Sequence, residues 1–382
     1  MHSSIKVLTN NKYKTLYQAI EQLSPVGETP VLIMDTNLIK ENHEQFRQEL
    51  NELSDAKVFY AVKANPHPGI VKFLYELGAG FEIASEEELD LVFSLNVPPS
   101  KIVSSNPVKT PSFIKSAYAK NVVYFAFDSY AEIEKLSQLA PESNVYVRLS
   151  VSNEGSEWPL DRKFGVDVED AVKLLLEAKR ENLKPCGITF HVGSQCNNPA
   201  TWVKAIEKSK IVWELTKSKG MELQLLNIGG GFPCEYTKHV PSITEIIRTI
   251  KSSLKLDFPQ DVKILVEPGR ALVGEAGILA TTVIGKAARA GKEWLYLDTG
   301  VFNGLMEATG GIKYRFVASR NGAAKKWVLA GPSCDAMDII SKSVELPELE
   351  IGDKVYVMSA GAYTTAYASR FDGFRIPRTY LI

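Results

Sequence analysis

A chain of 382 residues, 45% hydrophobic and 23% charged, has the composition of an ordinary globular protein and enough length for two domains. Its formal net charge of −1 predicts no general attraction to nucleic acid or to an anionic membrane. No apolar run approaches the roughly 18 residues of a membrane helix and no signal peptide follows Met1, so we expect no membrane partner.

The first predicted strand covers Pro30–Asp35, and a predicted helix follows over Asn37–Leu53. From Lys57 onward, short apolar segments alternate with segments of helical spacing. The strands predicted in this part are Lys57–Val62, Phe81–Ala84, Lys101–Ser104, Val122–Phe127, Val145–Leu149, Gly187–His191, Leu223–Ile228 and Val262–Val266. Eight strands that alternate with helices over about 210 residues favour a closed (β/α)8 barrel. The alternative is an open, doubly wound sheet, which is disfavoured because no G-x-G-x-x-G turn follows the first strand.

The alternation of predicted strands and helices ends after Arg270, where helices become scarce and Gly and Pro separate the strands. The strands predicted there are Ala280–Ile284, Glu293–Leu297, Lys326–Leu329 and Lys354–Met358. This pattern predicts a second, mainly β domain, which the strand near Val31 could join. We therefore expect a barrel over residues 37–276 and a β-rich domain made of residues 1–36 and 277–382.

The four cysteines are widely spaced and form no C-x-x-C pair. This spacing argues against a zinc site or a disulfide framework, and we expect no metal. It fits a protein of the reducing cytoplasm.

The active site of a barrel lies at the carboxyl ends of its strands, and several of the predicted strands end in reactive or ligand-binding residues. These residues are Lys63, Glu82, Arg148, His191 with Ser194, Gly229–Gly231, and Glu267 with Arg270. Together they predict one mouth that holds an amine, carboxylates, an imidazole, guanidinium groups and a glycine loop.

Each of these residues has an ordinary interpretation and a functional one. Lys63 taken alone is most simply a strand-end lysine that reaches solvent, but a neutral lysine amine can form a Schiff base. His191 is either a core histidine or a flat ring that stacks on an aromatic cofactor. The run Gly229–Gly231 is either a tight turn or a phosphate cradle of backbone N–H groups. Glu267 either pairs with Arg270 or accepts a hydrogen bond from a protonated pyridine nitrogen.

The functional interpretations agree with one another. A Schiff-base lysine, a phosphate cradle and a carboxylate for a pyridinium nitrogen together describe a site for pyridoxal 5′-phosphate (PLP). The carboxylate keeps the ring nitrogen protonated, so the ring can accept the electrons left on Cα when a bond breaks. Decarboxylation requires such an electron sink.

The chain resembles the fold type III PLP-dependent decarboxylases, which act on ornithine, lysine, arginine and diaminopimelate, and within them the ornithine decarboxylase branch most. The resemblance covers nearly the whole chain and implies an alanine racemase-like fold. The motifs that carry it are Tyr60–Asn65, Trp158–Gly165, Phe190–Gln195, Gly229–Pro233, Glu267–Arg270, Gly331–Asp335 and Gly361–Thr364.

The resemblance implies a role for each residue of the cofactor site. Lys63 would form the Schiff base, His191 would stack on the ring, and Glu267 would pair with the ring nitrogen. Glu82 and Arg148 would lie close to the cofactor. The phosphate ligands would be Ser194, Gly230, Gly231, Arg270 and Tyr363.

The resemblance also implies a substrate site shared across a head-to-tail homodimer. Cys334 would protonate Cα, Asp335 would meet the distal amine of a small amino-acid substrate, and Phe371 and Glu307 would also contact it. The carboxylate next to Cys334 in the sequence disfavours the thiolate, which keeps the proton available. Taken alone, Cys334 would more commonly be a small buried residue.

Two departures from the family pattern concern the cofactor and the substrate. Glu82 stands where the family usually has Asp. The acidic residue that grips the distal ammonium in ornithine decarboxylases is missing from Ala308–Gly311. Ornithine, giving putrescine and CO2, is the first expected substrate, followed by lysine. Diaminopimelate and a larger or conjugated diamino acid, such as a siderophore intermediate, are alternatives.

Two other functions fit the same fold. A racemase would normally pair the ring nitrogen with arginine, so Glu267 argues against it. An inactive regulatory protein that binds a protein partner would be expected to lose Lys63, Cys334 or the phosphate ligands, and all of these are present.

Overall fold

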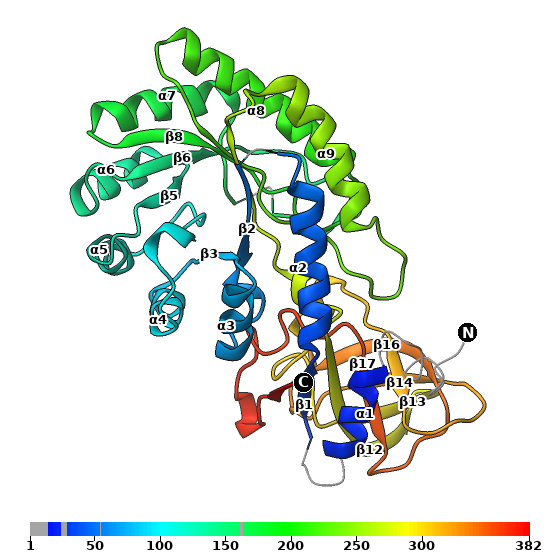
Figure 1. Cartoon of the computed structure of the whole chain (residues 1–382). Coiled ribbons are helices and arrows are strands. Elements are labelled where there is room, and N and C mark those ends of the chain that lie inside the picture. The colour runs from blue at the N-terminus through cyan, green and yellow to red at the C-terminus, as the bar shows by residue number, and fades with distance from the viewer. Residues whose placement is uncertain (1–13, 24–28, 54, 161–162) are drawn as a thin grey trace. The chain divides into compact units, whose positions relative to one another are not determined.

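A computed structural model describes residues 14–23, 29–53, 55–160 and 163–382 (Figure 1). The chain divides into two compact units. The barrel unit comprises Lys40–Pro233 and Val240–Gly269, and the β unit comprises the residues up to Ile39, Cys234–His239 and Arg270–Ile382. The sequence predicts the border at residue 276, whereas the compact units divide after Gly269, and Arg270 bonds Glu307 and Tyr236 within the β unit.

The barrel unit contains eight parallel strands in the order β4-β3-β2-β11-β10-β8-β6-β5. A parallel bridge between Ser104 and Phe125 joins the two ends of this order, so the strands form a ring and not an open sheet. The predicted barrel is confirmed, with each strand within two or three residues of its predicted position. The strands are β2 (Asp55–Ala61), β3 (Gly80–Glu82), β4 (Ile102–Val103), β5 (Tyr124–Phe127), β6 (Asn144–Arg148), β8 (Lys184–Thr189), β10 (Leu225–Asn227) and β11 (Lys263–Val266).

Helices follow the strands and form the outer layer of the barrel unit (Figure 1). They are α3 (Pro68–Glu76), α4 (Glu86–Ser94), α5 (Pro111–Ala119), α6 (Tyr130–Leu139), α7 (Val168–Arg180), α8 (Ala200–Ser218) and α9 (Ile243–Asp257). The first turn of α4, α5, α6, α7 and α9 is capped by a Ser, Thr or Asp side chain that accepts a backbone N–H three residues later. Each cap stabilises its helix by about 1 kcal/mol and fixes where the preceding loop ends. None of the described helices is long and apolar enough to cross a lipid bilayer.

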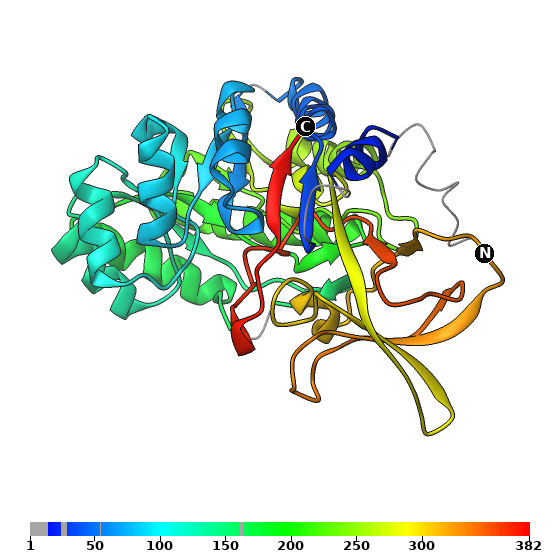
Figure 2. The same cartoon turned by 90° about the horizontal axis from the view of Figure 1, so that it is seen from below.

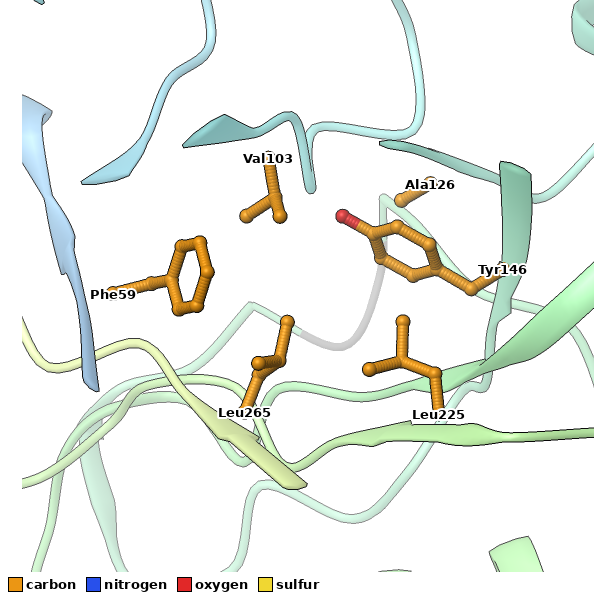
Figure 3. Packing of buried hydrophobic residues seen from close by; sticks show 6 residues of the cluster. All are labelled: Phe59, Val103, Ala126, Tyr146, Leu225 and Leu265. Carbon is orange, nitrogen blue, oxygen red and sulfur yellow. The ribbon is translucent and has the colours of Figure 1, made fainter. Parts of the chain in front are cut away.

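The centre of the barrel is filled by buried side chains that point toward one another from six different strands (Figure 3). At the same level, Gly187 lies so close to β10 that a Cβ there would meet Leu225 O at 2.3 Å. The barrel is therefore a packed core and not a channel, and its reactive groups can lie only at its ends. The residues of this cluster are Phe59, Val103, Ala126, Tyr146, Leu225 and Leu265.

The β unit is built on a second sheet of eight strands. Its main path runs β14-β17-β12-β13-β15-β16, and β1 pairs antiparallel with β12 and parallel with β18. The N-terminal strand therefore joins this sheet, as the sequence suggested. The strands are β1 (Val31–Met34), β12 (Gly277–Arg289), β13 (Lys292–Leu297), β14 (Phe316–Ala318), β15 (Lys325–Ala330), β16 (Ile339–Leu346), β17 (Lys354–Val357) and β18 (Arg378–Leu381).

Figure 2 shows β1 (blue) beside β18 (red), with the long hairpin of β12 and β13 (yellow) nearby in the same unit. Ala290 and Gly291 form the turn of this hairpin, both with positive φ, as a two-residue turn between twisted strands requires. The helices α1 (Lys14–Leu23) and α2 (Thr36–Leu50) precede and follow β1. The sequence predicted α2 but not α1, nor the strands β14, β16 and β18.

Candidate active site

Lys63 lies just beyond β2, on a single 3-10 turn over Val62–Ala64 that we call η2. The hydroxyl of Tyr60 donates to the carbonyl of Asn65 at 3.1 Å and closes this turn. The Lys63 side chain is 47% exposed and its amine forms an ion pair with the carboxylate of Glu82, which is 1% exposed at the end of β3. The amine is thus anchored on a buried acid yet open to a molecule from solution.

Glu267 follows β11, and one of its carboxylate oxygens is held by two side chains. Oε1 accepts hydrogen bonds from the Ser105 hydroxyl and from Asn227 Nδ2, the latter at 2.6 Å. Ser105 Oγ also bonds the Tyr146 hydroxyl at 2.8 Å, and Asn227 Oδ1 accepts the Gly229 N–H at 2.9 Å. Both side-chain bonds go to Oε1, so Oε2 can accept a bond from a ligand.

The sequence reasoning did not identify Ser105, Asn227 or Tyr146. The sequence could have indicated two of them, because Ser105 lies just beyond β4 and Asn227 is the last residue of β10. Both therefore occupy strand ends of the kind that carry the other candidates.

Two acids near Lys63, Glu267 and Glu88, have raised pKa values. Burial raises the pKa of Glu267 to about 7, and the charge of Glu82 adds to this. Burial and Glu82 likewise raise the pKa of Glu88 to about 7. Glu88 lies in the first turn of α4, where its Oε2 accepts the Ala84 N–H at 2.7 Å. The surplus of negative charge makes this end of the barrel favourable for a cation or a protonated ring nitrogen.

His191 follows β8, and its ring orientation is fixed by the backbone. Its Nδ1 accepts the Gly193 N–H at 3.0 Å, which assigns the ring proton to Nε2. Burial, and then the charges of Arg148 and Lys63, lower the pKa of His191 well below its usual range, so the ring is neutral. A Cβ at Gly230 would lie 3.1 Å from Nε2, so glycine keeps the space beside the ring open.

Two glycine turns come together next to His191. Gly231 has a φ of +98°, and a Cβ there would meet Gly193 O at 2.5 Å. Gly229 has a φ of +64°, and a Cβ there would meet Phe190 O at 2.1 Å. Ser194 begins the short strand β9 (Ser194–Cys196) next to these turns. Glycines without a side chain and a nearby hydroxyl together form a cradle suited to a phosphate.

Arg148 is the last residue of β6, and its guanidinium lies 5.3 Å from the centre of the Phe164 ring. Burial lowers its pKa, while the charges of Glu267, Asp128 and Glu82 oppose this shift. Phe164 belongs to the motif Trp158–Gly165, of which Asp161 and Arg162 lie outside the described residues.

Arg270 lies in the β unit, at the start of the short helix α10 (Arg270–Val273). Its guanidinium bonds both oxygens of Glu307, with Nη1 2.7 Å from Oε2 and Nη2 2.5 Å from Oε1. It also donates to the Tyr236 hydroxyl and lies 4.8 Å from the centre of the Tyr363 ring. Arg270 and Glu307 are each only 3% exposed, so both charges are buried and paired.

This pairing bears on the predicted substrate role of Glu307. Its carboxylate, on the 3-10 turn η4 (Met306–Gly310), is used by Arg270 within the same unit. The rest of η4 and Gly311 carry no charged side chain. The substrate role of Glu307 stays a prediction, and Arg270 would compete with the substrate for its carboxylate.

Cys334 lies in an exposed turn of the β unit, close to a residue that the sequence did not indicate. Its Sγ lies 3.1 Å from Asp372 Oδ2, and its backbone N–H donates to the same oxygen at 3.1 Å. Asp372 raises the pKa of the thiol more than Asp335 does. The neighbour that acts most on Cys334 is thus 38 residues away and not the adjacent Asp335.

The two remaining substrate candidates are near Cys334 in the β unit. Asp335 Oδ1 accepts the Met337 N–H at 2.8 Å and so stabilises its own turn. The Phe371 ring, on the 3-10 turn η5 (Phe371–Gly373), packs on Phe302 with 4.7 Å between ring centres. Cys334 and Phe371 are therefore linked through Asp372, the residue after Phe371.

The candidates fall into three groups, each described within its own unit. The ends of the barrel strands carry the Lys63, Glu267 and His191 environments, and the β unit carries one group around Arg270 and another around Cys334. Among the described residues, no set of three or more His, Cys, Asp or Glu side chains is arranged to hold a metal ion.

Comparison with known proteins shows the family to which the chain is similar. A family model described as "Pyridoxal-dependent decarboxylase, pyridoxal binding domain" matches residues 36–274. The lysine/ornithine decarboxylase of Selenomonas ruminantium is 36% identical over 378 residues, which cover 98% of this chain and 93% of that protein. Antizyme inhibitor 2 of Xenopus laevis is 35% identical over 362 residues, which cover 90% of this chain and 78% of that protein.

A solved structure is similar over most of its length. It is the lysine decarboxylase of Selenomonas ruminantium in complex with PLP and cadaverine, with a TM-score of 0.88 and 34% identity. The match covers 96% of this chain and 93% of that chain.

The side chains at the barrel ends fit PLP in their chemistry. The cofactor needs a reachable lysine amine, a neutral imidazole and a glycine cradle. It also needs a carboxylate of which one oxygen is held by the protein and the other is available. A Cβ at Gly230 or Gly231 would close the cradle, which supports the same assignment. The chain belongs to the family of pyridoxal-dependent decarboxylases, which are carboxy-lyases that use PLP as their cofactor.

Proposed function

We propose that this protein removes the α-carboxylate of an L-diamino acid, with ornithine or lysine as substrate and a diamine and CO2 as products. The observation that carries the proposal is the Glu267 carboxylate, with Oε1 held by Ser105 and Asn227. An acid at this position favours a protonated ring nitrogen, and PLP when bound then supplies the electron sink that decarboxylation needs. The name of the relative from Selenomonas ruminantium supports the two substrates.

In this proposal each barrel residue has one task. The Lys63 amine would hold the cofactor. The Glu267 carboxylate would hold a proton at the ring nitrogen, and the neutral ring of His191 would lie against the cofactor. The backbone N–H groups of Gly230 and Gly231 and the Ser194 hydroxyl would hold the phosphate.

The β unit would supply the remaining groups. Arg270 and Tyr363 are proposed as further phosphate ligands, and Cys334 as the acid that gives Cα its proton. We further propose a homodimer in which Cys334 and Asp335 serve the partner's barrel. All four cysteines are free thiols, which supports a reducing, cytoplasmic location.

A racemase and an inactive regulator are weaker alternatives. A carboxylate at the ring nitrogen favours the strong electron sink of a decarboxylase over racemisation. Antizyme inhibitor 2 is among the relatives, so similarity alone does not separate an enzyme from a regulator. The presence of Lys63, Cys334 and the phosphate ligands supports an enzyme.

A second candidate substrate is a diamino acid whose distal nitrogen is capped or conjugated. The observation that favours it is the pairing of Glu307 with Arg270, because it uses the acidic side chain of η4. A desolvated ammonium that loses one charged partner is destabilised by on the order of a few kcal/mol. A substrate without that ammonium has no such cost.

One experiment tests both proposals. The purified protein with PLP should absorb near about 420 nm, lose this band on borohydride reduction, and release CO2 from ornithine or lysine. The assay is repeated with diaminopimelate and with acylated diamino acids. A protein that takes up no PLP contradicts the cofactor site. If a conjugated diamino acid is turned over much faster than ornithine and lysine, the conjugate is the substrate.

A further inference from the structure

The Cys334 thiol shares one carboxylate oxygen with its own backbone. The Sγ of Cys334 and its N–H both lie 3.1 Å from Asp372 Oδ2. A hydrogen bond to a charged acceptor is stronger than one to a neutral acceptor, and two bonds from one residue leave it little rotational freedom. Asp372 therefore sets both the direction of the S–H bond and the charge beside it.

Asp372 is itself held in a defined conformation. It has a φ of +54° and a ψ of +15°, in the left-handed region that aspartate tolerates better than most residues. The N–H of Gly373 donates to the carbonyl of Arg370 at 2.9 Å and closes the turn that contains Asp372. The preceding residue, Phe371, packs its ring on Phe302. The carboxylate is thus carried by a short turn that is fixed on both sides.

The turn that carries Cys334 is fixed as well. The buried carboxylate of Asp338 accepts the N–H of Val301 at 2.8 Å and the N–H of Ser333 at 3.0 Å. A Cβ at Gly331 would meet Asp338 Oδ1 at 2.2 Å, so glycine lets this carboxylate reach the backbone. The geometry between Cys334 and Asp372 is therefore built from two supported turns.

The charged groups that face the thiol are both acids. Asp372 acts through its hydrogen bond and its charge, and Asp335, on the same turn as Cys334, acts more weakly through its charge. The oxygen Oδ1 of Asp335 is occupied by the N–H of Met337. Both acids raise the pKa of the Cys334 thiol, and Asp372 does so most.

We propose that Asp372 is a positioning residue that keeps Cys334 protonated and holds its sulfur in place, so that Cys334 reacts as an acid and not as a nucleophile. The proposal rests on the proposed role of Cys334 as proton donor. In that step the bond between Cα and the carboxylate breaks, and CO2 leaves without the electron pair. The pair forms a new bond to the thiol proton, and the sulfur is left as a thiolate. The charge of Asp372 disfavours that thiolate, so water returns a proton to the sulfur before the next turnover.

The rate at which iodoacetamide alkylates Cys334 reports how readily the thiol loses its proton, and it can be measured without substrate. We compare the pH profile of Cys334 alkylation in the holoenzyme with that of the isosteric Asp372→Asn variant. Loss of the carboxylate should lower the pKa of the thiol, and alkylation at about pH 8 should become roughly tenfold faster for each pKa unit lost. Asp372 is exposed, so this change does not threaten the fold. Cys334→Ala gives the background from the other cysteines.

Asp335→Asn is the matched control, because it removes the other acid near the thiol. It should shift the alkylation profile much less than Asp372→Asn does. An unchanged profile in Asp372→Asn, or an equal shift in both variants, overturns the proposal. A shifted profile in Asp372→Asn together with full amine formation by Cys334→Ala would instead reject Cys334 as proton donor.

Discussion

Arg270 and Glu307 form a salt bridge in which both side chains are 3% exposed. Burial of two charges is expensive, and their attraction offsets this cost only when the geometry is good and the remaining donors are satisfied. The two parallel bonds between guanidinium and carboxylate meet the condition on geometry, and the Tyr236 hydroxyl accepts a further bond from Arg270. Glu307 therefore positions Arg270, whatever else it contacts.

Glu307→Gln should destabilise the protein without PLP by on the order of 3 kcal/mol, because it leaves a buried guanidinium without its anion. Added inorganic phosphate should restore the melting temperature of this variant more than that of the parent protein. Thermal unfolding with and without phosphate measures both effects, and Glu350→Gln, an exposed glutamate of the same unit, is the control. If Glu307→Gln leaves the stability unchanged but raises KM, Glu307 contacts the substrate and does not position Arg270.

At the scale of elements, several barrel strands are short and their ends carry the candidate residues. β3 has three residues and β10 has three, so a turn begins within a few residues of the packed core. Because parallel strands end at the same side of the barrel, residues from β2, β3, β4, β8, β10 and β11 meet there. The glycine turn after β10 lies among them because only residues without a Cβ allow two backbone segments to approach this closely.

Gly231→Ala tests the glycine turn, and Gly220→Ala is its matched control. Both glycines have positive φ, but a Cβ at Gly220 meets nothing within 4 Å, whereas one at Gly231 meets Gly193 O at 2.5 Å. Gly220→Ala should cost about 1 kcal/mol of stability from backbone strain alone and bind PLP normally. Gly231→Ala should also weaken PLP binding at least tenfold, because it separates the two turns. Titration of the PLP-free protein with PLP measures this, and equal affinities for the two variants would contradict the cradle.

At the scale of the whole molecule, the candidate residues are divided between the two units. Lys63, the proposed anchor of the cofactor, belongs to the barrel unit, and Cys334, Asp335 and Phe371 belong to the β unit. We propose a homodimer with shared sites, which requires that one protomer supply Lys63 and the other Cys334.

Mixing two inactive variants tests the shared sites. Lys63→Ala and Cys334→Ala proteins should each be nearly inactive, and their mixture should regain up to about a quarter of the parent activity, because half of the random dimers hold one intact site. The control mixes Lys63→Ala with the double variant and should stay inactive. Activity no greater than the sum of the separate proteins would place Lys63 and Cys334 in the same protomer.

Much of the fold follows from local patterns in the sequence. The eight barrel strands and the joining of the N-terminal strand to the β sheet were predicted because apolar segments of four to eight residues alternate with helical spacing. The helix α1 and the strands β14, β16 and β18 were not, because they are short or polar and depend on packing for their stability. The ends of elements also shifted by a few residues, as at β5, which begins at Tyr124 and not at Val122.

The candidate residues of the cofactor site were predicted from the sequence, because they lie in short motifs, many of them at strand ends. The residues that orient these side chains were not. Ser105 and Glu267 are 162 residues apart in the sequence, and nothing local to either predicts their bond. The same holds for Arg270 with Glu307 and for Cys334 with Asp372, which are 37 and 38 residues apart.

The sequence by itself determined the fold class and the cofactor, and it predicted Lys63 as the anchor of the cofactor, because periodicity and motifs depend on neighbours along the chain. Only the tertiary structure decided which carboxylate meets which cation or thiol. It placed Glu307 on Arg270 and Asp372 on Cys334, where the sequence had pointed to a substrate contact and to the adjacent Asp335. The reason is physical, since an ion pair or hydrogen bond forms between groups that folding brings together, and folding brings together residues that are distant in the sequence.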